Sequence, residues 1–110
     1  MRKNLTVIRG DTFSFNFIVG KEIQGAYFSA KETLDKDDTD YIFQKTLEDG
    51  IEFIEHNKEG YVYMVKVAPE DTNEIDGGTY FYDLQIELDG DTYTPLIGEY
   101  TIRNDVTREV

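Results

Sequence analysis

The residues best suited to chemistry in this sequence are a group of aspartates. Four carboxylates stand within residues 35–40, and they are Asp35, Asp37, Asp38 and Asp40. Carboxylate oxygens are good ligands for Ca²⁺, but this spacing lacks the glycine and the glutamate that an EF-hand loop carries at its sixth and twelfth positions. We interpret the segment as a solvated turn, with a weak calcium contact as the open alternative.

Catalytic groups of the usual kinds are scarce. His56 is the only histidine, there is no cysteine, and His56 falls in a predicted polar turn at residues 56–60. A multi-histidine metal site, a thiolate site and a disulfide framework are therefore excluded, and a Ser-His-Asp triad has a single candidate base. Acidic pairs occur by abundance alone, because 23 of the 110 residues are Asp or Glu. We expect no enzyme activity, no catalytic residues and no cofactor.

The triplet Arg9-Gly10-Asp11 spells a tripeptide by which some adhesive proteins bind integrins. Such a signal needs a protruding loop, whereas here a glycine turn between two predicted strands accounts for the triplet. We interpret it as a turn.

The eight tyrosines and seven phenylalanines raise the question of an aromatic binding platform. Most of them fall on strand faces that alternation predicts to be buried, which favours a role in the core. Phe81 and Tyr93 are out of phase with the buried faces of their strands. We take Phe81 and Tyr93 as candidate interface residues.

Strands must position all of these side chains. Thr, Ile and Val together supply 28 residues, whereas Ala supplies only three, a composition typical of β-sheet. Alternation of apolar and polar residues predicts strands over residues 12–19, 61–67, 80–88 and 94–102. Weaker patterns predict strands over residues 4–9, 26–33, 41–45 and 51–55.

Turn signals recur about every ten residues between these segments, as in an antiparallel sandwich or barrel. Asp89-Gly90 predicts a type I′ hairpin turn, and Pro95 predicts an edge or a bulge. Pro69 and the acids after it predict one short helical turn within residues 69–75.

Length and composition indicate one domain over residues 1–110, with loose ends at residues 1–3 and 107–110. We expect an all-β fold, an immunoglobulin-like antiparallel β-sandwich of seven or eight strands. A small Greek-key or SH3-like barrel is the alternative.

Charge narrows the range of partners. The net charge is −12, which disfavours nucleic acid and anionic membranes. Residues 1–31 carry five bases and two acids, or +3, so residues 32–110 carry −15. No apolar run approaches the length of a membrane span, and no signal peptide is evident, so we expect an intracellular product.

The order of motifs resembles the small β-sandwich domains of tailed-phage and prophage structural proteins, including the N-terminal domain of the baseplate upper protein family. The resemblance covers nearly the whole chain. Its elements are Ile8-Arg9-Gly10-Asp11-Thr12-Phe13-Ser14-Phe15, Gly60-Tyr61-Val62-Tyr63, Pro69-Glu70-Asp71-Thr72, Gly78-Thr79-Tyr80-Phe81-Tyr82-Asp83-Leu84-Gln85 and Thr94-Pro95-Leu96-Ile97-Gly98-Glu99-Tyr100-Thr101-Ile102.

Part of this pattern has its own physical meaning. Asp71 and Thr72, followed by Gly78 and by Tyr80 and Tyr82, are similar to the corner between the fifth and sixth strands of immunoglobulin domains. There a tyrosine hydroxyl bonds to the backbone. Tyr80 or Tyr82 is the candidate for this structural corner.

The resemblance implies a non-enzymatic virion component of the tail, baseplate or neck, assembled in the cytoplasm of a bacterial host. Its partners would be other virion proteins and copies of itself in a ring, with no nucleic acid and no membrane. The uneven charge would suit head-to-tail packing of unlike surfaces. A carbohydrate-binding or cell-surface adhesion module remains the alternative, because β-sandwiches host both functions.

Overall fold

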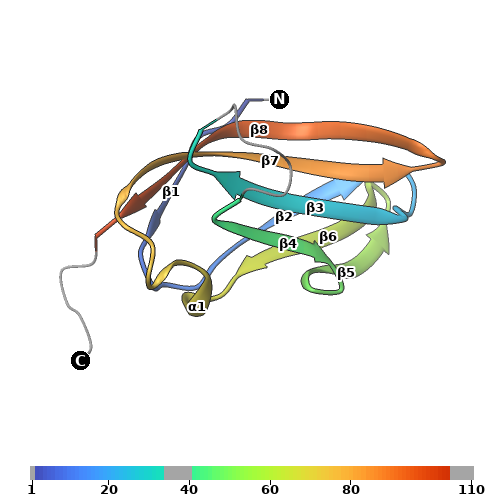
Figure 1. The fold of residues 1–110 in the computed structure, drawn as a ribbon. Coiled ribbons are helices and arrows are strands. Elements are labelled where there is room, and N and C mark those ends of the chain that lie inside the picture. Colours follow the sequence, from blue (N-terminus) through green and yellow to red (C-terminus); the bar gives the residue numbers. More distant parts are fainter. Residues whose placement is uncertain (1, 34–40, 105–110) are drawn as a thin grey trace.

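The computed structural model describes residues 2–33 and 41–104. Eight strands and one helical turn follow one another along the chain (Figure 1). They are β1 Leu5–Ile8, β2 Phe13–Val19, β3 Gly25–Lys31, β4 Phe43–Leu47, β5 Gly50–Asn57, β6 Gly60–Val67, α1 Pro69–Thr72, β7 Gly78–Leu88 and β8 Asp91–Arg103. All eight predicted strands are present, and α1 is the predicted helical turn. At four residues, the one helix of the described chain is too short to cross a membrane.

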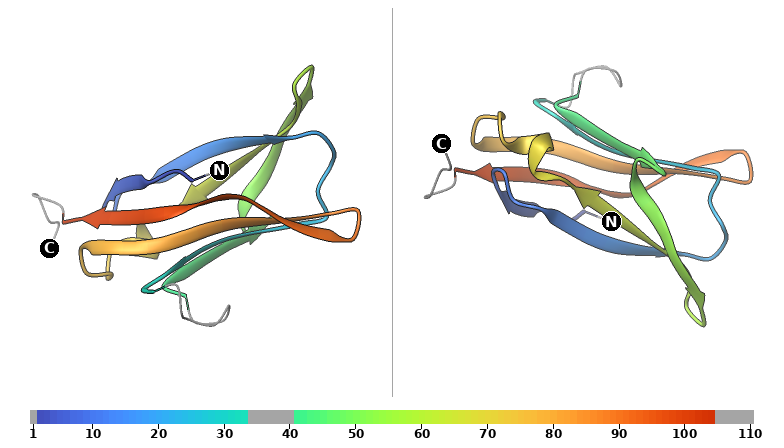
Figure 2. Two further views of the ribbon diagram at one scale, coloured as in Figure 1. Left: turned by 90° about the horizontal axis from the view of Figure 1, so that it is seen from above. Right: turned by 90° about the horizontal axis from the view of Figure 1, so that it is seen from below.

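The strands form an immunoglobulin-like β-sandwich. Their hydrogen-bonded order is β1-β8-β7-β3-β4-β5-β6-β2. Strands β1, β8, β7, β3 and β4 make one layer, and β5, β6 and β2 make the other (Figure 2). Among the described strands, hydrogen-bonded pairing joins the two layers only between β4 and β5, which share two residue pairs. Strands β1 and β2 are therefore the two ends of the hydrogen-bonded order.

Two pairings differ from a purely antiparallel arrangement. Strand β1 runs parallel to β8, with Leu5 opposite Tyr100, and β4 runs parallel to β5. Alternation along a strand predicts which face is buried, but it carries no information about the direction of the neighbouring strand. Parallel pairing of β1 was for this reason not predictable from its four residues.

The hairpin between β7 and β8 follows the sequence prediction closely. Asp89 and Gly90 have φ angles of 54° and 85° and lie between the paired residues Leu88 and Asp91. Two successive positive φ values are the signature of a type I′ turn, which Asp-Gly adopts at low cost. The register of this hairpin shifts near Pro95, where a bulge follows the Leu84–Leu96 pair.

The core is a set of aromatic rings between the two layers. Phe28 and Tyr100 are fully buried at its centre. Rings from the opposite layer pack edge-on against both, since Phe15 lies 5.4 Å from Phe28 and Phe13 lies 6.1 Å from Tyr100. Such tilted and edge-to-face pairs stabilise a core beyond the area that they bury.

The N-terminal end is not loose where the structure describes it. The amide of Lys3 donates to the carbonyl of Ile97 at 2.9 Å, and the carbonyl of Lys3 accepts the hydroxyl of Tyr82 at 2.6 Å. Long-range bonds of this kind have no local sequence signal, which is why the prediction for residues 1–3 was wrong at Lys3. The predicted loose end at residues 107–110 lies outside the described residues.

Tyr100 provides a test of the core. Its hydroxyl is buried without a hydrogen-bond partner among residues 2–33 and 41–104, and burial raises the pKa of this phenol, so it stays neutral. A buried unsatisfied hydroxyl costs about 1–3 kcal/mol. We expect Tyr100→Phe to raise the free energy of unfolding by about 1 kcal/mol in urea denaturation.

Tyr82→Phe is the matched control, because it removes a hydroxyl that is bonded to Lys3. We expect that variant to lose about 1 kcal/mol. A destabilised Tyr100→Phe would contradict the assignment of an unpaired hydroxyl.

Candidate interface surfaces

The outer face of the five-stranded layer carries a shallow polar groove. Tyr27, Ser29 and Lys31 alternate outward along β3, and their cross-strand partners on β7 are Gln85, Asp83 and Phe81. The groove has a volume of about 220 Å³. Its lining is Tyr27, Ser29, Lys31, Gln44, Asp83 and Gln85.

The floor of this groove is pre-organised. Ser29 is only 6% exposed although it points to the outer face. The Nε2 of Gln44 donates to the Ser29 hydroxyl at 2.8 Å. A smaller hollow of about 70 Å³ continues from Ser29 toward Phe81 and Ile97. The outer face thus combines a hydrogen-bonding floor with apolar side chains at both ends.

The two predicted interface residues lie on different surfaces. Phe81 is opposite Glu99 on the outer face, as predicted from its phase, but it is half-buried. Tyr93 is 49% exposed, yet the bulge in β8 places it opposite Ile86, whose side chain is buried. Directly opposed residues share one face of a sheet. The prediction that Tyr93 is out of phase with the core face was therefore wrong, because the bulge shifts the register.

The residues of the predicted structural corner make separate contacts in the structure. The Tyr80 hydroxyl donates to the carbonyl of Asp76 at 2.6 Å, which is the bond expected of such a corner. Burial, with Asp76 nearby, raises the pKa of Tyr80. Buried Thr72 accepts the amide of Gly10 at 2.9 Å, so the turn after β1 is tied to the helix. Tyr82 instead bonds the N-terminal end, as described above.

Asp71 has a structural role in the same corner. Its Oδ2 accepts the amide of Ala68 at 2.7 Å and pairs with Lys45 Nζ at 2.7 Å, where both side chains are largely covered. A carboxylate in the first turn of a helix also suits the positive end of the backbone dipole. Asp71, Thr72 and Tyr80 therefore each make a contact that supports the fold.

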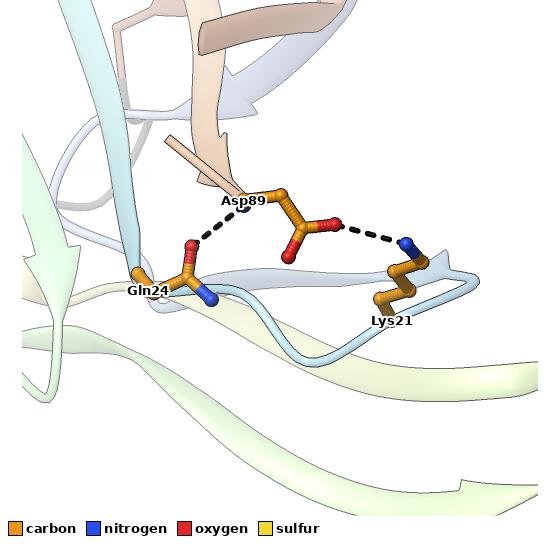
Figure 3. Close-up of polar contacts among 3 residues, drawn as sticks. All are labelled: Lys21, Gln24 and Asp89. Atoms are coloured by element: carbon orange, nitrogen blue, oxygen red, sulfur yellow. Dashed lines mark hydrogen bonds and ion pairs between the residues drawn. The ribbon is translucent and has the colours of Figure 1, made fainter. Parts of the chain in front are cut away.

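Polar contacts also fix the tip of the β7–β8 hairpin (Figure 3). Lys21 Nζ lies 2.9 Å from Asp89 Oδ2, and the amide of Asp89 donates to Gln24 Oε1 at 2.8 Å. Hydrogen bonding to Asp89 raises the pKa of Lys21. Because the ion pair is exposed, it contributes little to stability, but with Gln24 it locates the loop between β2 and β3.

The structure describes two of the three remaining sequence candidates. His56 lies in β5, not in a turn, and stacks on Tyr61 with ring centroids 4.1 Å apart. The Arg9-Gly10-Asp11 triplet forms a tight turn in which the amide of Asp11 donates to Ile8. The cluster at Asp35, Asp37, Asp38 and Asp40 lies outside the described residues. Among the residues that the structure does describe, no three His, Asp or Glu side chains gather as a metal site would need.

A second groove was not predicted from the sequence. It lies at the open side of the sandwich, between β2 and the β1–β8 edge, and has a volume of about 310 Å³. Its lining is Lys3, Leu5, Phe15, Asn16, Phe17, Tyr82, Pro95 and Leu96. Alternation predicted that the phenylalanines of β2 face inward, but only the strand order reveals that no strand within residues 2–33 and 41–104 covers this side.

Comparisons with known proteins support the fold alone. No family model matches the chain, and no curated protein matches it. CopC from Methylosinus trichosporium OB3b, a solved structure, is similar over 96% of this chain and 89% of its own, with a TM-score of 0.50 and 12% identity. A chain of the ZIG-8–RIG-5 IG1–IG1 heterodimer is similar over 96% of this chain and 83% of its own, with a TM-score of 0.38 and 9% identity.

A substitution at Gly98 tests the contact between β8 and the N-terminal segment beside the second groove. Gly98 is buried in β8, and a Cβ there would collide with the backbone carbonyl of Lys3. Since a backbone cannot swing aside as a side chain does, we expect Gly98→Ala to cost about 1–3 kcal/mol and to expose the N-terminal segment to proteases. Gly20→Ala is the control, because no atom lies within 4 Å of its added Cβ. Equal stability of the two variants in urea denaturation would contradict this contact.

Proposed function

We propose that the chain is a non-enzymatic structural component of a phage or prophage virion, in the tail, baseplate or neck. It acts by protein–protein assembly. The order of its motifs, which resembles small virion β-sandwich domains, supports the virion setting, and the immunoglobulin-like sandwich is compatible with it. Fold alone does not imply function, so the proposal depends on the surface that the sandwich presents.

The observation that carries assembly is the outer face of the five-stranded layer. Tyr27 and Ile97 are 37% and 39% exposed on this face, and half-buried Phe81 lies beside Ile97. Aromatic and aliphatic side chains around a hydrogen-bonding floor are typical of protein interfaces. A face of this composition is suited to cover by another protein.

Charge indicates the chemistry of the partner. Three carboxylates point outward on this face, which also carries the ammonium group of Lys31. They belong to Asp83, Glu87 and Glu99. A partner surface with arginine or lysine at its rim would complement these carboxylates and associate faster at low salt. We therefore propose a partner with a basic, aromatic patch, which another virion protein would supply.

Virion particles test the proposal. Particles induced from the bacterium that encodes the chain should contain it in fixed stoichiometry, measured by quantitative mass spectrometry after gradient purification. The double variant Tyr27→Ala and Ile97→Ser should fold but be at least tenfold depleted from particles. A tenfold loss of affinity corresponds to about 1.4 kcal/mol of binding free energy, and removal of two interface contacts readily costs that much. Glu55→Ala, on the other layer, is the control. Intact particles without the chain would refute the proposal.

Carbohydrate binding is the second candidate, favoured by one feature of the same groove. Tyr27 flanks a pocket with the amides of Gln44 and Gln85, and an aromatic ring beside amides can stack on and hydrogen-bond a sugar. Calorimetric titration with oligosaccharides from bacterial cell surfaces distinguishes the two functions. Saturable binding by the native chain that is lost in Tyr27→Ala and kept in Glu55→Ala would support a carbohydrate-binding module. If the native chain and both variants gave only identical heats of dilution, carbohydrate binding would be excluded.

A further inference from the structure

Strand β2 has a free hydrogen-bonding edge. It pairs with β6 through seven consecutive residue pairs, from Phe13–Val67 to Val19–Tyr61, without a bulge. It ends the strand order, and no other strand within residues 2–33 and 41–104 covers its second edge. The edge therefore offers a straight row of backbone donors and acceptors.

The sequence of β2 has none of the features that keep edge strands apart. Its seven residues, Phe-Ser-Phe-Asn-Phe-Ile-Val, include no charge and no proline. Monomeric proteins protect edges with lysines, prolines, bulges or very short strands. The opposite end of the order, β1, follows that rule with four residues. An uncharged seven-residue edge in a chain of net charge −12 indicates that β2 is covered by another strand.

The apolar groove beside β2 indicates what that strand must bring. The groove of about 310 Å³ opens between Phe15 and Phe17 on one side and Leu5 and Leu96 on the other. Phe13, Phe15, Phe17 and Val19 are each half-buried on the inner face. A covering strand with large apolar residues at alternate positions would fill the groove and complete the burial of these rings.

We propose that β2 pairs antiparallel with β2 of a second copy of this chain. Full overlap of the seven residues places the two-fold axis at Asn16. Inner-face residues then meet inner-face residues, with Phe15 opposite Phe17 of the partner subunit. Aromatic pairs across strands stabilise a sheet. The three-stranded layers of the two copies become one six-stranded sheet.

Charge at the ends of β2 favours this self-pairing. In the same register, the turn with Asp11 just before β2 comes to the end of the pair at which Lys21 of the partner subunit follows its own β2, and the relation repeats on the other side of the axis. Lys21 is exposed, and its contact with Asp89 leaves two of its three ammonium protons for a second carboxylate. Self-pairing thus brings unlike charges together although the whole chain is strongly acidic. It uses a different surface from the proposed outer-face interface and does not depend on it.

Sedimentation velocity tests the pairing. At an ionic strength of about 0.15 M, the protein should sediment with twice the 12.7 kDa chain mass as its concentration rises. Asn16→Lys places two like charges on the axis and should give a monomer with an unchanged circular dichroism spectrum. Glu52→Gln changes the charge by the same +1 on the same layer, two strands from the axis, and should stay dimeric.

Disulfide crosslinking tests the register of the β2–β2 pair. Because the chain has no cysteine, only an introduced cysteine can form a disulfide. Opposed residues in such a pair are about 4.5–5.5 Å apart, within disulfide range. Asn16→Cys should oxidise to a covalent dimer. Ser14→Cys should not, because four residues separate the two Ser14 positions, about 13 Å at the usual strand rise.

A monomer at every concentration overturns the proposal, and the edge then belongs to a strand of a different protein. A dimer that Asn16→Lys leaves intact also overturns it, because the copies then meet through another surface. Equal crosslinking of the Asn16→Cys and Ser14→Cys variants overturns the register. None of these outcomes bears on the presence of the chain in virions.

Discussion

The contact of aromatic rings across the two layers is the interaction on which this protein depends. Phe13 and Phe15 of the three-stranded layer meet Tyr100 and Phe28 of the five-stranded layer. With no disulfide to tie the layers and a seam of only two residue pairs between β4 and β5, packing carries the stability. Strand β2 supplies the rings of the three-stranded layer. The same strand ends the hydrogen-bonded order, and no strand among the described residues pairs with its second edge.

The polar side chains of the described residues mostly support this arrangement. Two acids of the described residues serve the fold: Asp71 lies in the first turn of α1 and pairs with Lys45, and Asp89 anchors a hairpin turn. The single histidine stacks on Tyr61. What remains is an outer face with a polar floor at Ser29 and an apolar groove beside β2. Our proposals assign both surfaces to the recognition of another molecule.

The two surfaces differ in the partner chemistry that they favour. The outer face is rimmed by carboxylates such as Asp83 and Glu99, so it favours a basic partner and responds to salt. The β2 edge is uncharged, so it favours backbone pairing and apolar contact, which salt screens little. Under our two proposals, the chain would bind its own copy and a foreign protein at once through separate surfaces.

The sequence by itself determined the strands, the short helix, the Asp89-Gly90 hairpin and the inward faces of β2, β6 and β7, because backbone preference and period-two alternation are local properties. It also narrowed the corner bond to Tyr80 or Tyr82. Only the tertiary structure decided that β1 runs parallel to β8, that a bulge turns Tyr93 to the core side, that Lys3 is tied to Ile97, and that no described strand pairs with the second edge of β2. Each of these depends on which distant strands meet, and alternation specifies a face without specifying a neighbour.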